Sequence, residues 1–393
     1  MKNTIPYGKH YIDDEDIEAV IDVLKYRNLT QGTVVNDFEE GVAKFVGAKY
    51  AVAMSSWTSG LHMACLAAGV QKNNLVATSP ITFVASANAA KFCQADPIFC
   101  DIDRSSLNIS PIHLQEIAKN PPAKIQAIIP VHFAGTPCDM ESISSIAKET
   151  NSYVIEDAAH ALGAKYSDGA MVGSCKYSDM TGFSFHPVKS IAAGEGGMIT
   201  TNDEDIYKKL LKLRSHGINK SNNYINHSLA YTNELENPWY YEMQELGYNY
   251  RITDIQCALG LSQLKKLPKF LARRKDLVAQ YDNAFSHLNN LTPTQLEYRN
   301  QSSHHLYVVR INFDAVGISR AELMVELQKE GVLAQVHYIP VTSHPYYQEL
   351  GFDSEDYPES LNYYDEALSI PLYYSLTNED QSKVISLITK LIG

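Results

Sequence analysis

The sequence has no long hydrophobic run, no paired cysteines and no excess of positive charge. No uninterrupted apolar stretch reaches membrane-spanning length, and the first residues lead into acidic, polar sequence without the apolar core of a signal peptide. The six cysteines are scattered and form no Cys-x-x-Cys pair, which gives zinc and redox sites little support. The net charge of −12 disfavours a nucleic-acid binder, because binding phosphates needs a clustered basic surface. We therefore expect a cytoplasmic protein that binds neither membranes nor nucleic acids.

The signatures of several common enzyme classes are also missing. The chain contains neither Gly-x-Gly-x-x-Gly nor Gly-x-x-x-x-Gly-Lys-Ser/Thr, so dinucleotide and P-loop nucleotide sites lose their main support. The nucleophile elbow Gly-x-Ser-x-Gly is absent as well. The histidines, including His304 and His305, lack metal-ligand spacing with acids. We therefore expect no catalytic metal.

Short apolar strands alternate with amphipathic helices from about residue 50. We expect strands at Tyr50–Met54, Leu75–Thr78, Pro97–Cys100, Ile125–Ile129, Tyr153–Ile155, Gly182–Phe185 and Gly197–Thr201, and helices at Ser59–Gly69, Thr82–Phe92 and Asp203–Leu213. Near-continuous apolar strands separated by helices are typical of a parallel sheet that is covered on both faces. The fold class predicted from this pattern is α/β with a mostly parallel sheet.

The second part of the chain departs from this pattern. Residues 215–250 are polar, rich in Asn and Tyr and too long for an ordinary connection, so we expect a functional loop or an arm that contacts a partner. A helix from about Asp254 to Lys266 and a longer one from Phe270 to Leu288 should follow, and the last hundred residues should form an α+β unit. We expect two domains, a large one over 1–253 and a smaller one over 254–393.

Two residues carry the main chemical signal. Lys189 follows a buried strand and precedes Gly194–Gly197, and Asp157 ends another apolar strand. A lysine that can hold an aldehyde as a Schiff base, together with an acid for a ring nitrogen, is the minimum equipment for pyridoxal phosphate (PLP) chemistry. Each has an ordinary alternative, since an isolated lysine is usually solvated and an isolated aspartate often caps a helix. Ligands collect at the carboxyl ends of parallel strands, where Asp157, Ser184 and the Ser55–Ser59 turn all fall.

Further candidates lie near the same strand ends. The turn Ser55–Gly60 offers hydroxyl and backbone N–H donors for a phosphate at a helix N-terminus, and Ser184 is a second donor. Phe83 is a candidate to stack on a cofactor ring, and His160 to lie near it. Ordinary helix capping and core packing are the alternatives for these residues.

Taken together, these motifs resemble the DegT-type family of PLP-dependent nucleotide-sugar aminotransferases, which have the fold type I, or aspartate aminotransferase-like, architecture. The resemblance covers nearly the whole chain and rests on Leu29–Gly32, Glu156–His160, Ser184–Lys189, Gly194–Gly197, Arg214–Gly217, Gly247–Arg251 and Ile370–Tyr373. It implies that Lys189 holds the cofactor, that Asp157 contacts the ring nitrogen, that His160 contacts the ring, and that Thr58, Ser59 and Ser184 contact the phosphate. It also implies that Asn249 reaches the phosphate in the neighbouring subunit, which makes the protein a homodimer with shared active sites.

Two stretches, Pro238–Gln244 and Gln335–Pro340, are most similar to transaminases of the pseudaminic acid pathway. The similarity implies that an amino group passes from L-glutamate, which leaves as 2-oxoglutarate, to C4 of a UDP-linked 4-keto-6-deoxy-N-acetylhexosamine. The candidate substrate contacts are Tyr7, Lys9, Gln31, His186, Arg214, Arg251, His337 and Tyr338. The alternatives are C4 amination of another UDP- or TDP-linked keto sugar, a PLP-dependent sugar dehydratase, against which Lys189 argues, and a non-catalytic PLP sensor.

Overall fold

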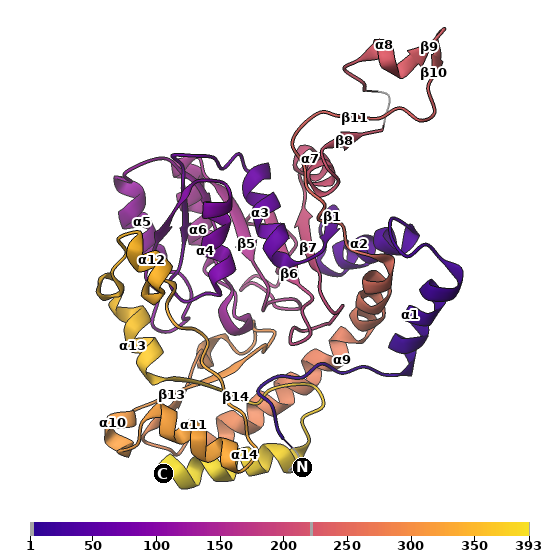
Figure 1. Cartoon of the computed structure of the whole chain (residues 1–393). Helices are drawn as coiled ribbons and strands as arrows, with labels where there is room; N and C mark the ends of the chain where they lie inside the picture. The colour runs from indigo at the N-terminus through magenta and orange to yellow at the C-terminus, as the bar shows by residue number, and fades with distance from the viewer. Residues whose placement is uncertain (1–3, 221–222, 393) are drawn as a thin grey trace.

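The computed structural model describes residues 4–220 and 223–392, and a seven-stranded sheet forms the centre of this part of the chain (Figure 1). The strands are β1 (Tyr50–Met54), β2 (Leu75–Thr78), β3 (Asp96–Phe99), β4 (Ile125–Ile128), β5 (Tyr153–Asp157), β6 (Met180–Ser184) and β7 (Gly197–Thr201). Their order is β1-β7-β6-β5-β4-β2-β3; β7 runs antiparallel to both neighbours, and the other pairs are parallel. The prediction of an α/β fold with a mostly parallel sheet is confirmed.

Helices cover both faces of the sheet, because successive residues of each strand point to opposite faces and both sets are apolar. On one face, Val52 and Met54 of β1 pack with α3 (Trp57–Ala67), α4 (Val84–Phe92) and α7 (Glu204–Arg214). On the other face, Ala51 and Ala53 belong to a core that includes α2 (Thr33–Val46), α5 (Pro111–Lys119), α6 (Met140–Thr150) and part of α9 (Asp254–Phe285). A further helix, α1 (Asp14–Tyr26), packs against α9.

The long helix α9 corrects one prediction. The sequence predicted two helices with a break near residue 268, but α9 is a single helix of 32 residues with Pro268 inside it. Proline removes one backbone hydrogen bond from a helix. The flanking residues Leu267 and Phe270 are buried, and α1 and α2 pack along the helix. Tertiary packing therefore keeps the helix continuous where the local sequence favours a break.

The C-terminal part forms a smaller α+β unit, as expected. Its antiparallel sheet consists of β12 (Leu291–Pro293), β13 (Tyr307–Ile311) and β14 (Ala367–Ile370), and its helices are α10 (Phe313–Val316), α11 (Arg320–Lys329), α12 (Pro345–Glu349), α13 (Pro358–Glu366) and α14 (Asn378–Ile392). Ile5 packs into the core of this unit and donates its backbone N–H to Gly331 over 2.8 Å. The domain division 1–253 and 254–393 stays a prediction, and this contact shows that the N-terminal segment packs with the C-terminal unit.

The polar stretch after α7 extends away from the body of the molecule (Figure 1). We call residues 223–246 the arm; it contains α8 (His227–Ala230) and the short strands β9 (Tyr231–Thr232), β10 (Leu235–Glu236) and β11 (Glu242–Met243), the last paired with β8 (Ile218–Asn219). Trp239 is 75% exposed and Tyr241 is 55% exposed. Large aromatic side chains rarely stay so exposed on a monomer surface, so this geometry favours a contact surface. None of the described helices is long and apolar enough to cross a membrane.

Candidate active site

The carboxyl ends of β1, β2, β5 and β6 open into a pocket of about 740 Å³. Segments from both parts of the chain line it: Ser56–Thr58, Thr82–Ala85, Asp157, Ala159, His160, Ser184, His186, Val188 and Lys189 from the large sheet, and His305, Gln335–Ile339 and His344 from the C-terminal part. The volume is that of a small-molecule site. Of the expected site residues, it brings together Tyr7, Thr58, Phe83, Asp157, His160, Ser184, His186, Lys189, His337 and Tyr338.

Asp157 is the last residue of β5, and its carboxylate is held in one orientation. The Trp57 indole Nε1 donates to Oδ1 over 2.8 Å, and the Ser86 hydroxyl donates to Oδ2 over 2.6 Å. The backbone N–H of Ala159 also donates to Oδ1, over 3.2 Å. Asp157 is only 6% exposed. A carboxylate has about four lone-pair positions, so these bonds leave room for one more donor from the pocket.

A glycine in β6 makes this arrangement possible. Gly182 pairs with Asp157 in the sheet, and the Trp57 ring lies directly over it. A Cβ atom at position 182 would stand 1.7 Å from the indole, so any side chain there would displace the ring. The sequence reasoning missed both Trp57 and Ser86, although Trp57 lies inside the turn that was singled out for phosphate donors.

Lys189 follows β6 and lines the same pocket as Asp157. Burial lowers the pKa of its amine to about 8, and the charge of Asp157 acts in the opposite direction. At that pH half of the amine is neutral, whereas less than about 1% of an ordinary lysine is. The neutral amine is the nucleophile that captures an aldehyde. The geometry therefore suits Lys189 to carbonyl chemistry near neutral pH.

The expected phosphate donors divide into two groups. Thr58, in the first turn of α3, and Ser184, at the end of β6, both line the pocket, and Ser56 joins them. Ser59 does not line the pocket, because its hydroxyl donates to the carbonyl of Ser56 over 2.7 Å and closes a capping box. The N-terminus of α3 therefore presents Ser56 and Thr58 to an anion, while Ser59 holds the turn in shape.

Two histidines form a neutral polar wall on the pocket. The rings of His160 and His305 lie 4.3 Å apart, and the Tyr338 hydroxyl lies 3.2 Å from His160 Nε2. Burial, together with the positive charge of Lys189, lowers the pKa of both histidines well below the usual range. Within the described residues, neither Nδ1 has a hydrogen-bond partner. Each ring therefore keeps one buried nitrogen without a partner, and His305 is a pocket residue that the sequence reasoning did not find.

The remaining candidates differ in position. Phe83 is 59% exposed and stands 6.2 Å from the Tyr338 ring. His337 bonds to the Ser369 hydroxyl over 2.9 Å, and burial followed by the charge of Lys189 lowers its pKa to about 3. Lys9 lines a separate small crevice that also touches Lys189.

Gln31, Arg214, Asn249 and Arg251 do not line the pocket. Arg214 Nη1 lies 2.5 Å from Glu39 Oε1 and donates to the carbonyl of Ala53 over 2.8 Å. Arg214 therefore pairs within the chain, and the substrate contact expected for it stays a prediction. Asn249 is exposed and forms a backbone bridge with Ser215 at the base of the arm.

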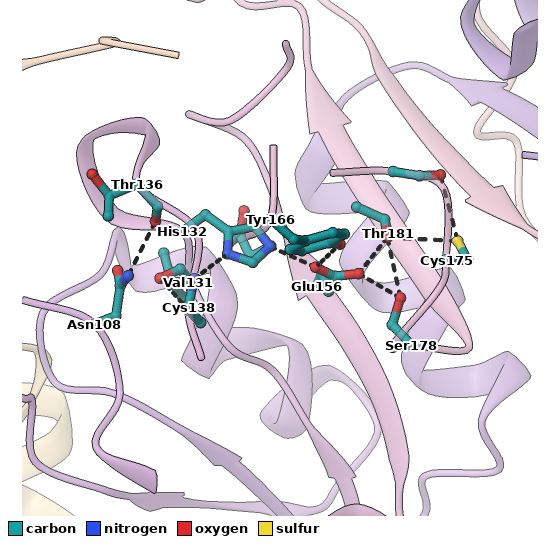
Figure 2. A network of polar contacts seen from close by, with 12 residues as sticks. Asn108, Val131, His132, Thr136, Cys138, Glu156, Tyr166, Cys175, Ser178 and Thr181 are labelled. Carbon is teal, nitrogen blue, oxygen red and sulfur yellow. Dashed lines mark hydrogen bonds and ion pairs between the residues drawn. The ribbon is translucent and has the colours of Figure 1, made fainter. Parts of the chain in front are cut away.

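The acid next to Asp157 points to the opposite face of the sheet. Figure 2 shows Glu156 surrounded by donors: His132 Nε2 at 2.7 Å, Tyr166 at 2.6 Å, Ser178 at 2.5 Å and Thr181 at 2.8 Å. Burial alone would raise the pKa of Glu156, but these hydrogen bonds and the charge of His132 outweigh it and lower the pKa. The four hydrogen bonds of Glu156 therefore hold β5, the strand that carries Asp157, in place from the opposite face of the sheet.

The donor set fits pyridoxal phosphate. Lys189 offers an amine whose pKa is lowered to about 8, Asp157 a fixed carboxylate, and Thr58 and Ser184 hydroxyls that line the same pocket. Among the described residues, no group of three or more potential metal ligands was found. Such a site on this fold defines the class of PLP-dependent transferases.

Comparison with known proteins identifies the family. The chain belongs to the DegT/DnrJ/EryC1/StrS aminotransferase family, whose model matches residues 10–389. It is therefore a PLP-dependent sugar aminotransferase with the aspartate aminotransferase-like fold expected from the sequence.

Three relatives show the range of the family around this chain. The chain is 38% identical to the spore coat polysaccharide biosynthesis protein SpsC of Bacillus subtilis, over 99% of this chain and 97% of the relative. It is 37% identical to a UDP-4-amino-4,6-dideoxy-N-acetyl-β-L-altrosamine transaminase of Campylobacter jejuni, over 96% of this chain and 94% of the relative. The solved structure of Helicobacter pylori PseC, an aminotransferase involved in the biosynthesis of pseudoaminic acid, matches with a TM-score of 0.88 and 30% identity, over 99% of each chain.

The lowered pKa of Lys189 gives a testable pH dependence. We expect the apoprotein to capture added PLP faster as the pH rises from 6.5, with a midpoint near pH 8, because only the neutral amine attacks the aldehyde. Stopped-flow absorbance of the cofactor measures this rate. A midpoint near the ordinary lysine value of about 10.4 would contradict the burial of the amine.

Proposed function

We propose that this protein transfers the amino group of L-glutamate to C4 of a UDP-linked 4-keto-6-deoxy-N-acetylhexosamine, on the route to pseudaminic acid. The observation that supports this chemistry is the pocket shared by Lys189 and Asp157. The pKa of the Lys189 amine is lowered to about 8, and hydrogen bonds from Trp57 and Ser86 fix the Asp157 carboxylate. The substrate is supported by the 37% identity to the altrosamine transaminase and by the likeness to Helicobacter pylori PseC.

The pocket residues divide into cofactor and substrate groups. When bound, PLP supplies an electron sink and carries the amino group between the two substrates. Lys189 would hold the aldehyde of the cofactor, Asp157 would accept a hydrogen bond from its ring nitrogen, and His160 would contact its ring. Thr58 and Ser184 would donate to its phosphate, and Phe83 would contact its ring. Tyr7, His186, His337 and Tyr338 line the remaining space, where the sugar enters.

Lys189 also moves the proton in each half of the reaction. Its free amine would take the proton from Cα of the amino donor. In the second half it delivers a proton to C4 of the sugar. A base works best when its pKa lies near the working pH, and the pKa of Lys189, at about 8, meets this condition. The neutral histidines His160 and His305 hold hydrogen-bonding positions without competing for that proton.

The active protein is a homodimer with shared active sites. Among the described residues that line the pocket, Lys189 is the sole lysine or arginine, although the substrates carry carboxylates and a diphosphate. Exposed Asn249 and half-buried Arg251 follow the arm, and Trp239 on the arm is largely exposed. A second copy that buries the arm would bring Asn249 to the cofactor phosphate of its partner.

A product assay tests the substrate. Purified protein with PLP and glutamate is offered UDP- and TDP-linked 4-keto-6-deoxy sugars separately, and the products are analysed by mass spectrometry and NMR. We expect a 4-amino sugar from the UDP-linked N-acetylhexosamine together with 2-oxoglutarate. A product that has lost a hydroxyl would point to a dehydratase, and no product despite bound PLP would point to a sensor.

A second candidate is C4 amination of a different nucleotide sugar. It is favoured by the 38% identity to the spore coat polysaccharide protein, which equals the identity to the altrosamine transaminase within a percentage point. The same assay separates the two candidates, because NMR of the product gives the configuration at C4 and the competing sugars reveal the preferred nucleotide.

A further inference from the structure

The C-terminal unit places the His305 ring against His160, a side chain expected to contact the cofactor. The two ring centroids are 4.3 Å apart and the ring planes differ by 33°. Both side chains line the active-site pocket together with Lys189. The Tyr338 ring is nearly parallel to that of His160, at 20°, with centroids 6.2 Å apart. His160 therefore packs against two rings that the C-terminal unit supplies.

The contact between the two histidines is ring on ring. The Nδ1 atom of His305 is buried and has no hydrogen-bond partner among the residues that the structure describes. Burial, followed by the charges of His160 and Lys189, lowers the pKa of His305 well below its usual range, so the ring is neutral. An uncharged ring whose Nδ1 bonds to nothing acts on its neighbour through its shape and its flat face.

The backbone that carries His305 is bonded directly to the segment that carries His160. The N–H of His305 donates to the carbonyl of Ala134 over 3.0 Å, and the Ser303 hydroxyl donates to the carbonyl of His160 over 2.7 Å. Gly135 permits this close approach. A Cβ atom there would stand 3.0 Å from the His160 carbonyl oxygen and closer still to the Ser303 hydroxyl, and the φ of 97° also favours glycine.

Arg274 of α9 holds the same segment. Its side chain is buried, and Nη1 donates to three backbone carbonyls, those of His304 at 3.3 Å, His305 at 3.1 Å and Leu372 at 3.1 Å. Burying a charged group is costly unless its donors are bonded, so these carbonyls and the guanidinium hold one another in place. The position of the His305 ring is therefore fixed by its backbone.

We propose that His305 is a positioning residue that fixes the plane of the His160 ring toward the cofactor. The Tyr338 hydroxyl, 3.2 Å from His160 Nε2, fixes one corner of that ring, and the flat face of His305 prevents the ring from tilting about this corner. His305 moves no proton in this role and acts only through His160. This role rests on the proposed function, because it takes His160 as a contact of the cofactor ring.

Binding of PLP to the apoprotein tests this role without turnover. We expect His305→Asn to shift the absorbance band of bound PLP and to raise its Kd about threefold to tenfold, because an amide lacks the flat ring against which His160 packs. His305→Phe should keep the band and the Kd of the unmodified protein, since a phenyl ring preserves the stacked face and leaves no nitrogen unpaired.

His304→Asn is the matched control for these variants. His304 is the neighbouring buried histidine of the same segment, but it does not line the pocket. Its φ of 54° is one that asparagine tolerates, and its carbonyl stays available to Arg274. We expect this variant to bind PLP with the band and the Kd of the unmodified protein. A shift equal to that of His305→Asn would assign the effect to folding of the segment and overturn the positioning role.

Kinetics of the glutamate half-reaction provide a second readout. We expect His305→Asn to lower kcat about tenfold to a hundredfold with little change in the KM for glutamate, because a small displacement at the cofactor affects the reaction more than the binding of the donor. His305→Phe should recover most of the rate. A normal rate and band in His305→Asn would overturn the role, and so would a phenylalanine variant that is no better than the asparagine variant.

The failures of the two proposals are distinguishable, because PLP binding and the glutamate half-reaction need no keto sugar. If the band, the Kd and the glutamate reaction are unchanged in His305→Asn while the UDP-sugar is aminated, the positioning role is wrong and the proposed function stands. If the variants behave as expected but the unmodified protein aminates no UDP-sugar, the proposed substrate is wrong and the positioning role stands.

Discussion

Lys189→Ala is expected to lower the transamination rate by about ten-thousandfold or more, because it removes both the amine that captures the aldehyde and the group that moves the proton. The amine cannot be replaced from within this chain, since Lys189 is the sole lysine among the described residues lining the pocket. Lys189→Arg should be as inactive, because guanidinium keeps the charge but not a nucleophilic amine. The measurement is 2-oxoglutarate release under saturating glutamate and keto sugar. Near-normal turnover in either variant would refute the central assignment.

Two further readouts distinguish lost chemistry from lost structure. The folded pKa of Lys189, at about 8, lies below its unfolded value, so the unfolded chain binds more protons between those values and the charged amine destabilises the fold at neutral pH. Lys189→Ala should therefore not lower the melting temperature at pH 7. The variant should also retain some PLP through the phosphate and ring contacts. Added methylamine should restore part of the rate, because a small free amine can occupy the space of the lost side chain.

The sequence predicted the sheet well, because its strands are short buried runs, and helices separate β1 to β5 from one another along the chain. All seven expected strands occur, and Asp157 and Ser184 lie at the carboxyl ends of β5 and β6, where such residues were expected. The continuous helix α9 was missed, since a proline at position 268 argues locally for a break and only packing argues against it. Local sequence patterns therefore predict those helices and strands whose formation depends only on their own residues, and they fail where tertiary packing decides the outcome.

The site was predicted less completely, because its contacts join distant segments. Ser86 and Asp157 are separated by 71 residues, and Arg214 and Glu39 by 175. Nothing in the sequence around Arg214 shows that it pairs with Glu39, so this ion pair could not be predicted. His305 enters the pocket from the C-terminal part, where neighbouring residues give no sign of a ligand. Such pairings depend on strand order and on how α9 positions the C-terminal unit.

Asp157→Asn is expected to lower the rate about a hundredfold or more, with a change in the cofactor absorbance. Asparagine keeps the size of the side chain, and its Oδ1 can still accept from Trp57 Nε1. It removes the negative charge that Asp157 would hold against a protonated ring nitrogen, and its amide group meets Ser86 where a carboxylate oxygen stood. Rates of the glutamate and keto-sugar half-reactions, together with PLP affinity, measure the effect. An unchanged rate and affinity would remove Asp157 from its role.

The choice of asparagine and of a neighbouring control makes this test specific. Asp157→Ala would leave the buried donors of Trp57 and Ser86 unpaired, at about 1–3 kcal/mol each, so a lost rate could reflect a disturbed fold. Glu156→Gln is the matched control, since it neutralises the adjacent acid of the same strand, which does not line the pocket and bonds to His132, Tyr166, Ser178 and Thr181 (Figure 2). It should lower the free energy of unfolding by about 1–3 kcal/mol while leaving the rate of the folded protein close to normal. Asp157→Asn would then lower the rate, whereas Glu156→Gln would lower the stability. This difference would show that the reaction needs the carboxylate that faces the pocket, and not any negative charge on β5.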